Sequence, residues 1–361
     1  MAQRGIHMEA ITSPGDRVES MSDELGIPVH TVDMPRSITP IRDLGSLAQL
    51  VGLLRRLDPD IVHSHTPKGG LLGVIAATLA GVETRFYHMR GLPFETAQGW
   101  KRALLMATET TSCTLAHQVI SVGRTIRQTA IDAQICPAHK IAVLADGSGQ
   151  GVDAEDRFDP GRFDDDHGRR IREKLGIDTD ADVIGFVGRL VRDKGIVELA
   201  DAWQQIRDDY PGAHLMAIGP FEKRDPVPKT TQQILEDDPR VHLLGYRSDV
   251  DELYTAMDML ALPTHREGFP NVSLEAQAME CPVVVSGIGA CRETIAEGET
   301  GICFPVGDAD ALADGLRTYL DDPELRRQHG EAGRRRVLDK FLPRRIWQAL
   351  AQLYEAYLDE R

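Results

Sequence analysis

The sequence contains no uninterrupted apolar run of the roughly eighteen residues that a membrane-spanning helix needs. The first residues, Met-Ala-Gln-Arg-Gly-Ile-His, lack the apolar core of a signal peptide, so we expect no export. The five cysteines are scattered and form no C-x-x-C pair, which argues against a disulfide framework or a zinc cage. Repeats of solenoid length and low-complexity tracts are also lacking. These absences predict a cytoplasmic globular protein.

The composition indicates an ordinary globular enzyme with room for two domains. The chain has 361 residues, of which 42% are apolar and 27% charged, enough for a sizeable core in each domain. The formal net charge of −15 disfavours nucleic acid as a partner.

Short β-rich runs alternate with longer amphipathic stretches, a pattern typical of βα units and parallel sheets. Around 157–170 the composition shifts to Asp, Arg and Gly, which we interpret as a connection between domains. We predict an α/β fold with two doubly wound, Rossmann-like domains facing a cleft, over 1–157 and 158–341, and a C-terminal helix over 342–361 that packs back on the first domain. The expected strands are Ile6–Thr12, Val29–Asp33, Ile61–His65, Arg85–His88, Gln118–Val122, Lys140–Leu144, Val183–Val187, His214–Ile218, Val241–Leu244, Met259–Leu262 and Val283–Val285.

The most informative segment runs from His265 to Ala276 and follows an expected strand. Gly268 and Pro270 predict an irregular turn, and Asn271 is a good N-cap for a helix that starts there. The free N–H groups of a helix N-terminus suit a diphosphate. Two carboxylates, Glu267 and Glu275, flank this point and could accept hydrogen bonds from sugar and ribose hydroxyls. A capped helix with two surface glutamates is the other interpretation.

A second segment, Ile184–Gly195, places a buried strand before a turn that ends in a helix. Arg189 and Lys194 bracket this turn. Two such cations could neutralise a leaving diphosphate in place of a divalent metal. Alternatively, both are solvated residues of an ordinary βα loop.

Together the two segments resemble the family-4 retaining glycosyltransferases, which have the GT-B fold. The resemblance rests on a Gly-Arg…Lys-Gly turn (Gly188, Arg189, Lys194, Gly195) and on a Glu-Gly-Phe-Pro-Asn…Glu segment (Glu267, Gly268, Phe269, Pro270, Asn271, Glu275). It implies that Arg189 and Lys194 hold the diphosphate, that Glu267 lies beside the transferred sugar and that Glu275 binds the ribose. It also implies that Tyr246 and Arg247, after a further strand, line the base.

The first half resembles a subgroup that builds bacterial capsular and exopolysaccharide units on a lipid carrier. The segments concerned are Asp60–Gly70, Tyr87–Thr96 and Asp146–Asp153. On the acceptor side, His65, Lys68 and Arg90 are candidates for contact with phosphate or sugar oxygens, although Lys68 and Arg90 could equally be ordinary loop charges. The resemblance implies that a hexose or N-acetylhexosamine is transferred with retention of the anomeric configuration. The expected donor is UDP-linked, and the expected acceptor is lipid-linked or a saccharide. No cofactor is expected.

The sequence predicts no metal. His63 and His65 point the same way from an expected strand, but we expect no carboxylate or cysteine partner to complete a site with them. The run Asp164–Asp166 lies in a charged linker rather than at a strand end, which favours a solvated turn.

Peripheral contact with the cytoplasmic face of the inner membrane is a further hypothesis. Trp100 lies beside Lys101 and Arg102 at the start of an amphipathic helix, a combination that suits a membrane interface; the alternative is a helix that packs in the core.

Two rival functions remain open at this stage. A sugar-nucleotide epimerase shares the GT-B fold but needs no acceptor. A catalytically impaired, N-terminally truncated donor-binding protein is the other, because the first expected strand begins at Ile6 with no Gly-rich turn and helix before it. We therefore expect the N-terminal domain to lack its first βα unit, and the explanation we favour is a start codon assigned too far downstream.

Overall fold

The computed structural model of this chain describes residues 5–15, 18–35 and 39–359. The chain divides into two compact units, one made of Met1–Gly149 with Ile346–Arg361 and the other of Gln150–Arg345. The boundary predicted after residue 157 therefore falls a short way inside the second unit. No described helix has both the length and the apolar character needed to cross a membrane.

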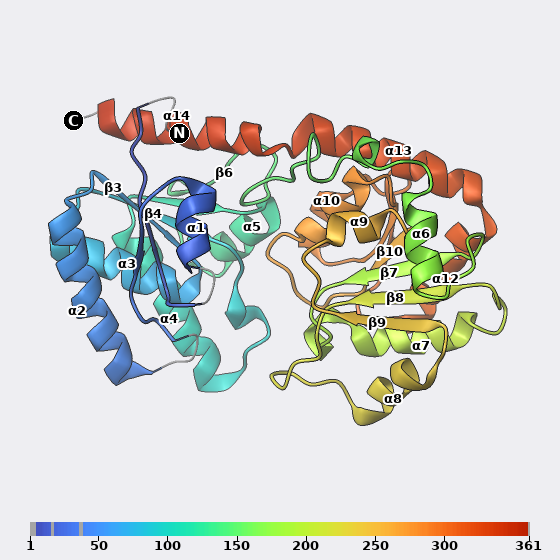
Figure 1. Cartoon of the computed structure of the whole chain (residues 1–361). Helices are drawn as coiled ribbons and strands as arrows, with labels where there is room; N and C mark the ends of the chain where they lie inside the picture. The colour runs from blue at the N-terminus through green and yellow to red at the C-terminus, as the bar shows by residue number, and fades with distance from the viewer. Residues whose placement is uncertain (1–4, 16–17, 36–38, 360–361) are drawn as a thin grey trace. The chain divides into compact units, whose positions relative to one another are not determined.

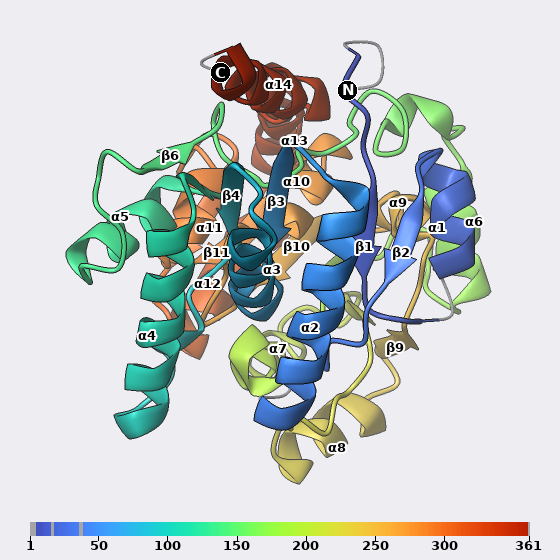
Figure 2. The ribbon, with the colours of Figure 1, turned by 90° about the vertical axis from the view of Figure 1, so that its left-hand side faces the viewer.

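The first unit contains two parallel sheets (Figures 1 and 2). Strands β1 (Ala10–Thr12) and β2 (Val29–Thr31) form one, and β3 to β6 form the other in their order along the chain. The remaining elements are α1 (Val18–Leu25), α2 (Pro40–Leu57), β3 (Ile61–His65), α3 (Pro67–Ala80), β4 (Thr84–Met89), η2 (Pro93–Glu95), α4 (Gly99–Leu115), β5 (Gln118–Ser121), α5 (Arg124–Asp132), β6 (Ile141–Val143) and α14 (Pro343–Asp359).

Helices cover both faces of the four-stranded sheet. Successive residues of a strand point to opposite faces, and on β4 the buried Tyr87 donates a hydrogen bond to Glu109 of α4 at 2.7 Å. Phe86 points the other way and packs with Ile120 of β5 against Tyr354 of α14. The C-terminal helix thus supplies part of the core of the first unit.

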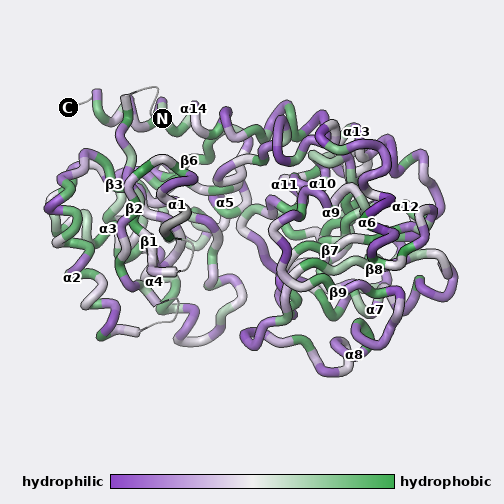
Figure 3. Tube along the Cα trace, viewed as in Figure 1, coloured by the Kyte–Doolittle hydropathy of each residue, from purple (hydrophilic) through white to green (hydrophobic). Residues whose placement is uncertain are grey.

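The second unit is built on one six-stranded parallel sheet with the order β12-β11-β10-β7-β8-β9. Its strands are mainly hydrophobic (Figure 3) because helices cover both of its faces. Its elements are η3 (Pro160–Arg162), α6 (His167–Lys174), β7 (Val183–Val187), η4 (Arg192–Lys194), α7 (Ile196–Ile206), β8 (His214–Ile218), α8 (Lys229–Asp237), β9 (Val241–Gly245), α9 (Val250–Tyr254), β10 (Met259–Leu262), α10 (Asn271–Ala278), β11 (Val283–Ser286), α11 (Gly289–Thr294), β12 (Gly301–Phe304), α12 (Ala309–Asp321) and α13 (Pro323–Lys340).

The predicted α/β class with two Rossmann-like units is confirmed, although details of individual elements differ from the prediction. The first strand covers only Ala10–Thr12, because these are the residues that find partners on the short β2. Helix α10 does begin at Asn271, but Pro270 occupies the N-cap position.

Candidate functional site

The strand order of the second unit reverses between β7 and β10, which lie side by side. In open α/β sheets, ligands bind beyond the carboxyl ends of the strands at such a switch point. The loop after β7 carries Lys194, and the loop after β10 carries Glu267. Lys194 Nζ donates a hydrogen bond to Glu267 Oε1, and each side chain is only 16% exposed. Two residues that the sequence placed in one site therefore touch.

Backbone contacts hold these two loops together. Gly195 has φ +73°, and a Cβ at this position would lie 2.0 Å from the carbonyl oxygen of Pro263. The carbonyl oxygen of Asp193 accepts from His265 N at 2.9 Å and from Thr264 Oγ1 at 3.1 Å. The glycine after Lys194 is thus required both by its backbone conformation and by the close approach of the β10 loop.

Arg189 lies on the same loop as Lys194 but has a different partner. Its guanidinium pairs with Glu222, from the segment after β8, at 2.9 Å, and its side chain is 46% exposed. Gly188, the residue before it, has φ +155°, and its carbonyl oxygen lies within 1.9 Å of where a Cβ of Gly219 would be. The two predicted diphosphate ligands therefore both follow β7, each held by its own carboxylate.

Glu275 lies on α10, whereas Glu267 lies in the loop before that helix. Burial raises the pKa of Glu275 from 4.5 to about 7, although the positive charge of Arg157 acts to lower it. Tyr254 hydroxyl lies 3.5 Å from its Oε2 and 3.3 Å from the carbonyl oxygen of Val272. The carboxyl is thus partly withdrawn from solvent beside the Tyr254 hydroxyl.

The other predicted donor-side residues lie in different environments. Gly268 and Pro270 are in the loop before α10, and Asn271 begins the helix. The Phe269 ring packs against Phe341 with ring centroids 5.9 Å apart, which is a core contact.

After β9, at the edge of the sheet, Tyr246 is 73% exposed. Arg247 beside it donates to Asp249 at 2.8 Å.

Sequence reasoning missed the residues that hold the site in place. The segment around Lys194 is anchored by Asp193, which pairs with Arg266 at 2.9 Å, and Glu198 of α7 pairs with His265 at 2.9 Å. Under α10, Ser273 and Thr294 share a buried hydrogen bond of 2.8 Å. Thr294 lies on α11, and no local sequence pattern indicated that it would meet Ser273.

The predicted acceptor-side residues lie in the first unit. His65 ends β3 and Arg90 follows β4; Arg90 Nε donates to His65 Nδ1 at 3.4 Å. Lys68, at the start of α3, pairs with Asp43 of α2 at 2.5 Å and donates to the carbonyl oxygen of Pro35 at 2.6 Å. A cavity of about 860 Å³ in this unit is lined by residues of β1 and β3 and includes His65 and Lys68.

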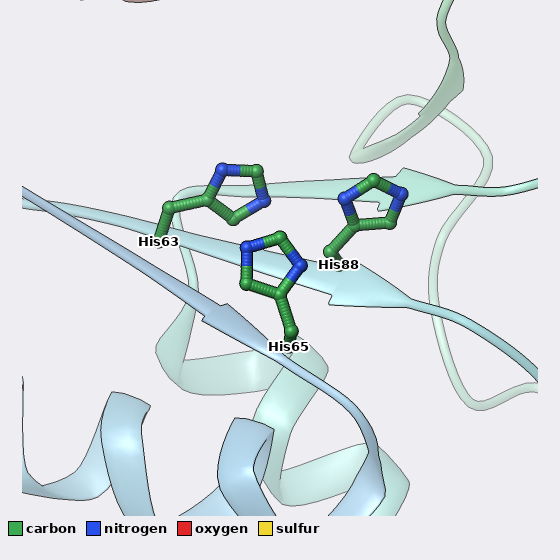
Figure 4. Close-up of side chains that lie close together, drawn as sticks. All are labelled: His63, His65 and His88. Carbon is green, nitrogen blue, oxygen red and sulfur yellow. The ribbon is translucent and has the colours of Figure 1, made fainter. Parts of the chain in front are cut away.

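Two further histidines join His65. His63 lies two residues earlier on β3, and His88 lies opposite His65 in the register between β3 and β4. The ligand-capable atoms of the three imidazoles all lie within 4.8 Å of one another (Figure 4). The sequence indicated His63 and His65 as a same-side pair; the contribution of His88 required the strand pairing.

Two family models match this chain. The model described as "Glycosyl transferases group 1" matches residues 168–336, and the one described as "Glycosyl transferase 4-like domain" matches residues 1–147.

Two related proteins are similar to this chain over most or all of its length. The capsular polysaccharide biosynthesis glycosyltransferase CapM of Staphylococcus aureus is 33% identical over 360 residues, covering 100% of this chain and 92% of that protein. The UDP-Gal:alpha-D-GlcNAc-diphosphoundecaprenol alpha-1,3-galactosyltransferase of Escherichia coli is 30% identical over 294 residues, covering 80% and 74%.

Among solved structures, Anabaena Alr3699/HepE in complex with UDP and glucose superposes with a TM-score of 0.81 at 21% identity, covering 97% of this chain and 100% of that one.

Proposed function

Because this chain belongs to the group 1 glycosyltransferases, with a glycosyltransferase 4-like N-terminal region, we propose that it is a retaining enzyme of bacterial surface polysaccharide synthesis. It transfers a hexose or N-acetylhexosamine from a UDP-linked donor to a lipid-linked or saccharide acceptor. The observation that carries this proposal is the contact between Lys194 and Glu267 at the switch point of the second sheet. Two relatives, one a capsule enzyme and one acting on a diphosphoundecaprenol-linked sugar, support the acceptor class.

The donor diphosphate would bind between the loops after β7 and β10 and the first turn of α10. Lys194 and Arg189 are both held by carboxylates, Glu267 and Glu222, in the structure. A diphosphate offers each cation a more highly charged partner, so binding would release the two glutamates. Two cations at this place neutralise the leaving group, and we propose that the transfer therefore needs no divalent metal at the diphosphate.

Freed from Lys194, Glu267 would face the transferred sugar. We assign it the positioning of sugar hydroxyls and stabilisation of positive charge at the anomeric carbon rather than nucleophilic attack. The acceptor hydroxyl would approach from the face that the leaving diphosphate occupies, and that diphosphate would take the proton. This route retains the anomeric configuration without a covalent enzyme intermediate. Glu275, with its raised pKa, would accept hydrogen bonds from the ribose once ionised.

Steady-state turnover with saturating donor tests this assignment. Lys194→Ala and Glu267→Gln should each lower kcat by about 100-fold or more, the size of effect seen when one preorganised group is removed from a transition state. Lys174→Ala, at an exposed lysine of α6 in the same unit, is the matched control and should leave kcat unchanged. Near-wild-type kcat in either site variant would refute the role given to that residue.

Contact with the cytoplasmic face of the inner membrane is proposed for the start of α4. Trp100 is 78% exposed and Leu104, one turn later, is 38% exposed, with the exposed cations Lys101 and Arg102 beside them. An exposed aromatic next to cations suits an anionic lipid surface. Co-sedimentation with anionic liposomes at low salt should fall strongly for Trp100→Asp and not for Trp347→Asp, at the exposed tryptophan of α14. Equal co-sedimentation of the wild type and both variants would contradict this contact.

A further inference from the structure

Three histidines meet on one face of the four-stranded sheet in the first unit. His63 and His65 are alternate residues of β3 and so point to the same side, and His88 of β4 lies opposite His65. Ring centroids are separated by 4.3 Å between His63 and His65, 5.3 Å between His63 and His88, and 5.1 Å between His65 and His88. Figure 4 shows a nitrogen of each ring directed toward the space between the rings.

The polar atoms of this cluster are poorly satisfied by protein groups. His63 Nε2 and both ring nitrogens of His88 are buried and have no hydrogen-bond partner among the described residues. His88 is only 3% exposed. Buried polar atoms without partners are rare in native proteins and costly, so each one calls for an explanation such as a bound ion.

A hydrogen bond with Tyr354 orients the His63 ring, as an outer partner commonly orients a metal-binding histidine. His63 Nδ1 lies 2.5 Å from the hydroxyl of Tyr354, which can accept the Nδ1 proton. In the tautomer with the proton on Nδ1, the opposite nitrogen, Nε2, is unprotonated and its lone pair is available to a metal. Metal-binding histidines characteristically direct their second nitrogen to such an outer partner.

The three members of the cluster differ in exposure. His88 is buried, His63 is partly buried and His65 is exposed. Burial lowers the pKa of each imidazole, most for His63 and His88, and the positive charge of Arg90 acts in the same direction on all three.

We propose that His63, His65 and His88 bind one divalent transition-metal ion, with Zn²⁺ as the probe. Three imidazoles leave one position of a tetrahedral ion for water or another oxygen. Zn–N bonds of about 2.0–2.1 Å require nitrogen atoms about 3.3 Å apart. The ring planes now lie at 24°, 9° and 33° to one another, so binding would require the rings to turn until their nitrogen lone pairs meet at one point. His63 and His65 line the 860 Å³ cavity, which provides a route for the ion.

The three histidines belong to the first unit and the proposed donor residues to the second, and the proposal does not rest on the proposed transfer reaction. It departs from the prediction of no metal made from sequence, which considered His63 and His65 without the third ligand.

The positive charge of Arg90 disfavours the binding of a cation by the three histidines. Its Nε always donates, so His65 Nδ1 must be the acceptor and His65 Nε2 must carry the proton in the metal-free protein. Metal binding through His65 therefore has to break this hydrogen bond or shift that proton. Removing the guanidinium should strengthen binding, an effect opposite to that of removing a histidine.

Titration of the chelator-treated full-length chain with Zn²⁺, followed by isothermal calorimetry, tests the proposal. The wild type should bind one ion per chain. His88→Gln should weaken binding by at least tenfold, and His139→Ala, at an exposed histidine of the same unit, should leave it unchanged. Arg90→Gln should tighten binding several-fold.

Each outcome decides the question. Absence of 1:1 binding in the wild type, or equal affinity in His88→Gln, would overturn the proposal and leave the cluster as a packing feature. Because a weakened signal could reflect misfolding, circular dichroism of each variant accompanies the titration. X-ray absorption of the Zn²⁺-loaded wild type gives an independent check, since fewer than three imidazole nitrogens around the ion would also refute the site. None of these measurements depends on sugar transfer.

Discussion

Replacing Glu275 by glutamine should change stability and nucleotide binding in opposite directions. The native carboxyl has a pKa of about 7 against an ordinary 4.5, because burial disfavours its charge. The native state thus holds the proton more tightly than the unfolded chain, and stability falls as pH rises from 4.5 to 7 and stays low above it. At about 1.4 kcal/mol per unit, this shift corresponds to roughly 3 kcal/mol. A glutamine at this position cannot ionise, so the variant does not lose this stability as the pH rises.

The variant should therefore match the wild type near pH 5 and be more stable by up to roughly 3 kcal/mol near pH 8. Denaturant unfolding followed by tryptophan fluorescence is a suitable assay. Trp203 is buried in the core of the second unit, which contains Glu275, whereas Trp100 and Trp347 are largely exposed in the first. The tryptophan fluorescence therefore reports mainly on unfolding of the second unit.

At pH 8 the variant should bind UDP at least about tenfold more weakly than the wild type, because a hydrogen bond to a charged acceptor is lost. Calorimetry measures this directly. Glu236→Gln, at an exposed glutamate of α8, is the matched control for both measurements. A Glu275→Gln protein that is less stable than the wild type at pH 8, or whose stability difference does not vary with pH, would refute the reasoning.

Three further perturbations test other parts of the structure. Gly195→Ala should destabilise the second unit by roughly 3 kcal/mol in denaturant unfolding, since φ is +73° and the new Cβ would meet Pro263; unchanged stability would contradict that packing. Glu109→Gln should remove a loss of stability between pH 4.5 and 7, because burial raises the pKa of Glu109 to about 7 and glutamine can still accept from Tyr87; a variant with the wild-type pH slope would count against this. Tyr354→Ala should cost about 3–5 kcal/mol in the unfolding of the first unit and leave UDP affinity unchanged; loss of UDP binding would show that α14 does more than complete that unit.

The sequence predicted the second unit in most of its elements. Strands such as Val183–Val187 and Met259–Leu262 match the structure, because buried parallel strands are continuous apolar runs bounded by turn residues. The last strand, Gly301–Phe304, was not predicted as a strand. It is short, and its glycine and cysteine give little β signal.

Prediction of the site was limited by contacts between distant segments. The sequence identified Lys194 and Glu267 as candidates, but their pairing depends on β7 and β10 being neighbours. The partner of Arg189, Glu222, lies beyond another strand and has no distinguishing sequence context. His88 became a member of the histidine cluster only through the register of β3 and β4. Local patterns show which residues are special, whereas the strand order shows which of them meet.

The path of α14 has a consequence for synthesis of this protein. Phe86 and Ile120 are covered by Tyr354, which is translated after the whole of Gln150–Arg345. The second unit is one continuous segment, and all of its residues leave the ribosome before Tyr354 does. The first unit, although made earlier, keeps part of its sheet uncovered until that helix emerges. The half of the chain that is synthesised first thus needs residues that are synthesised last to complete its core.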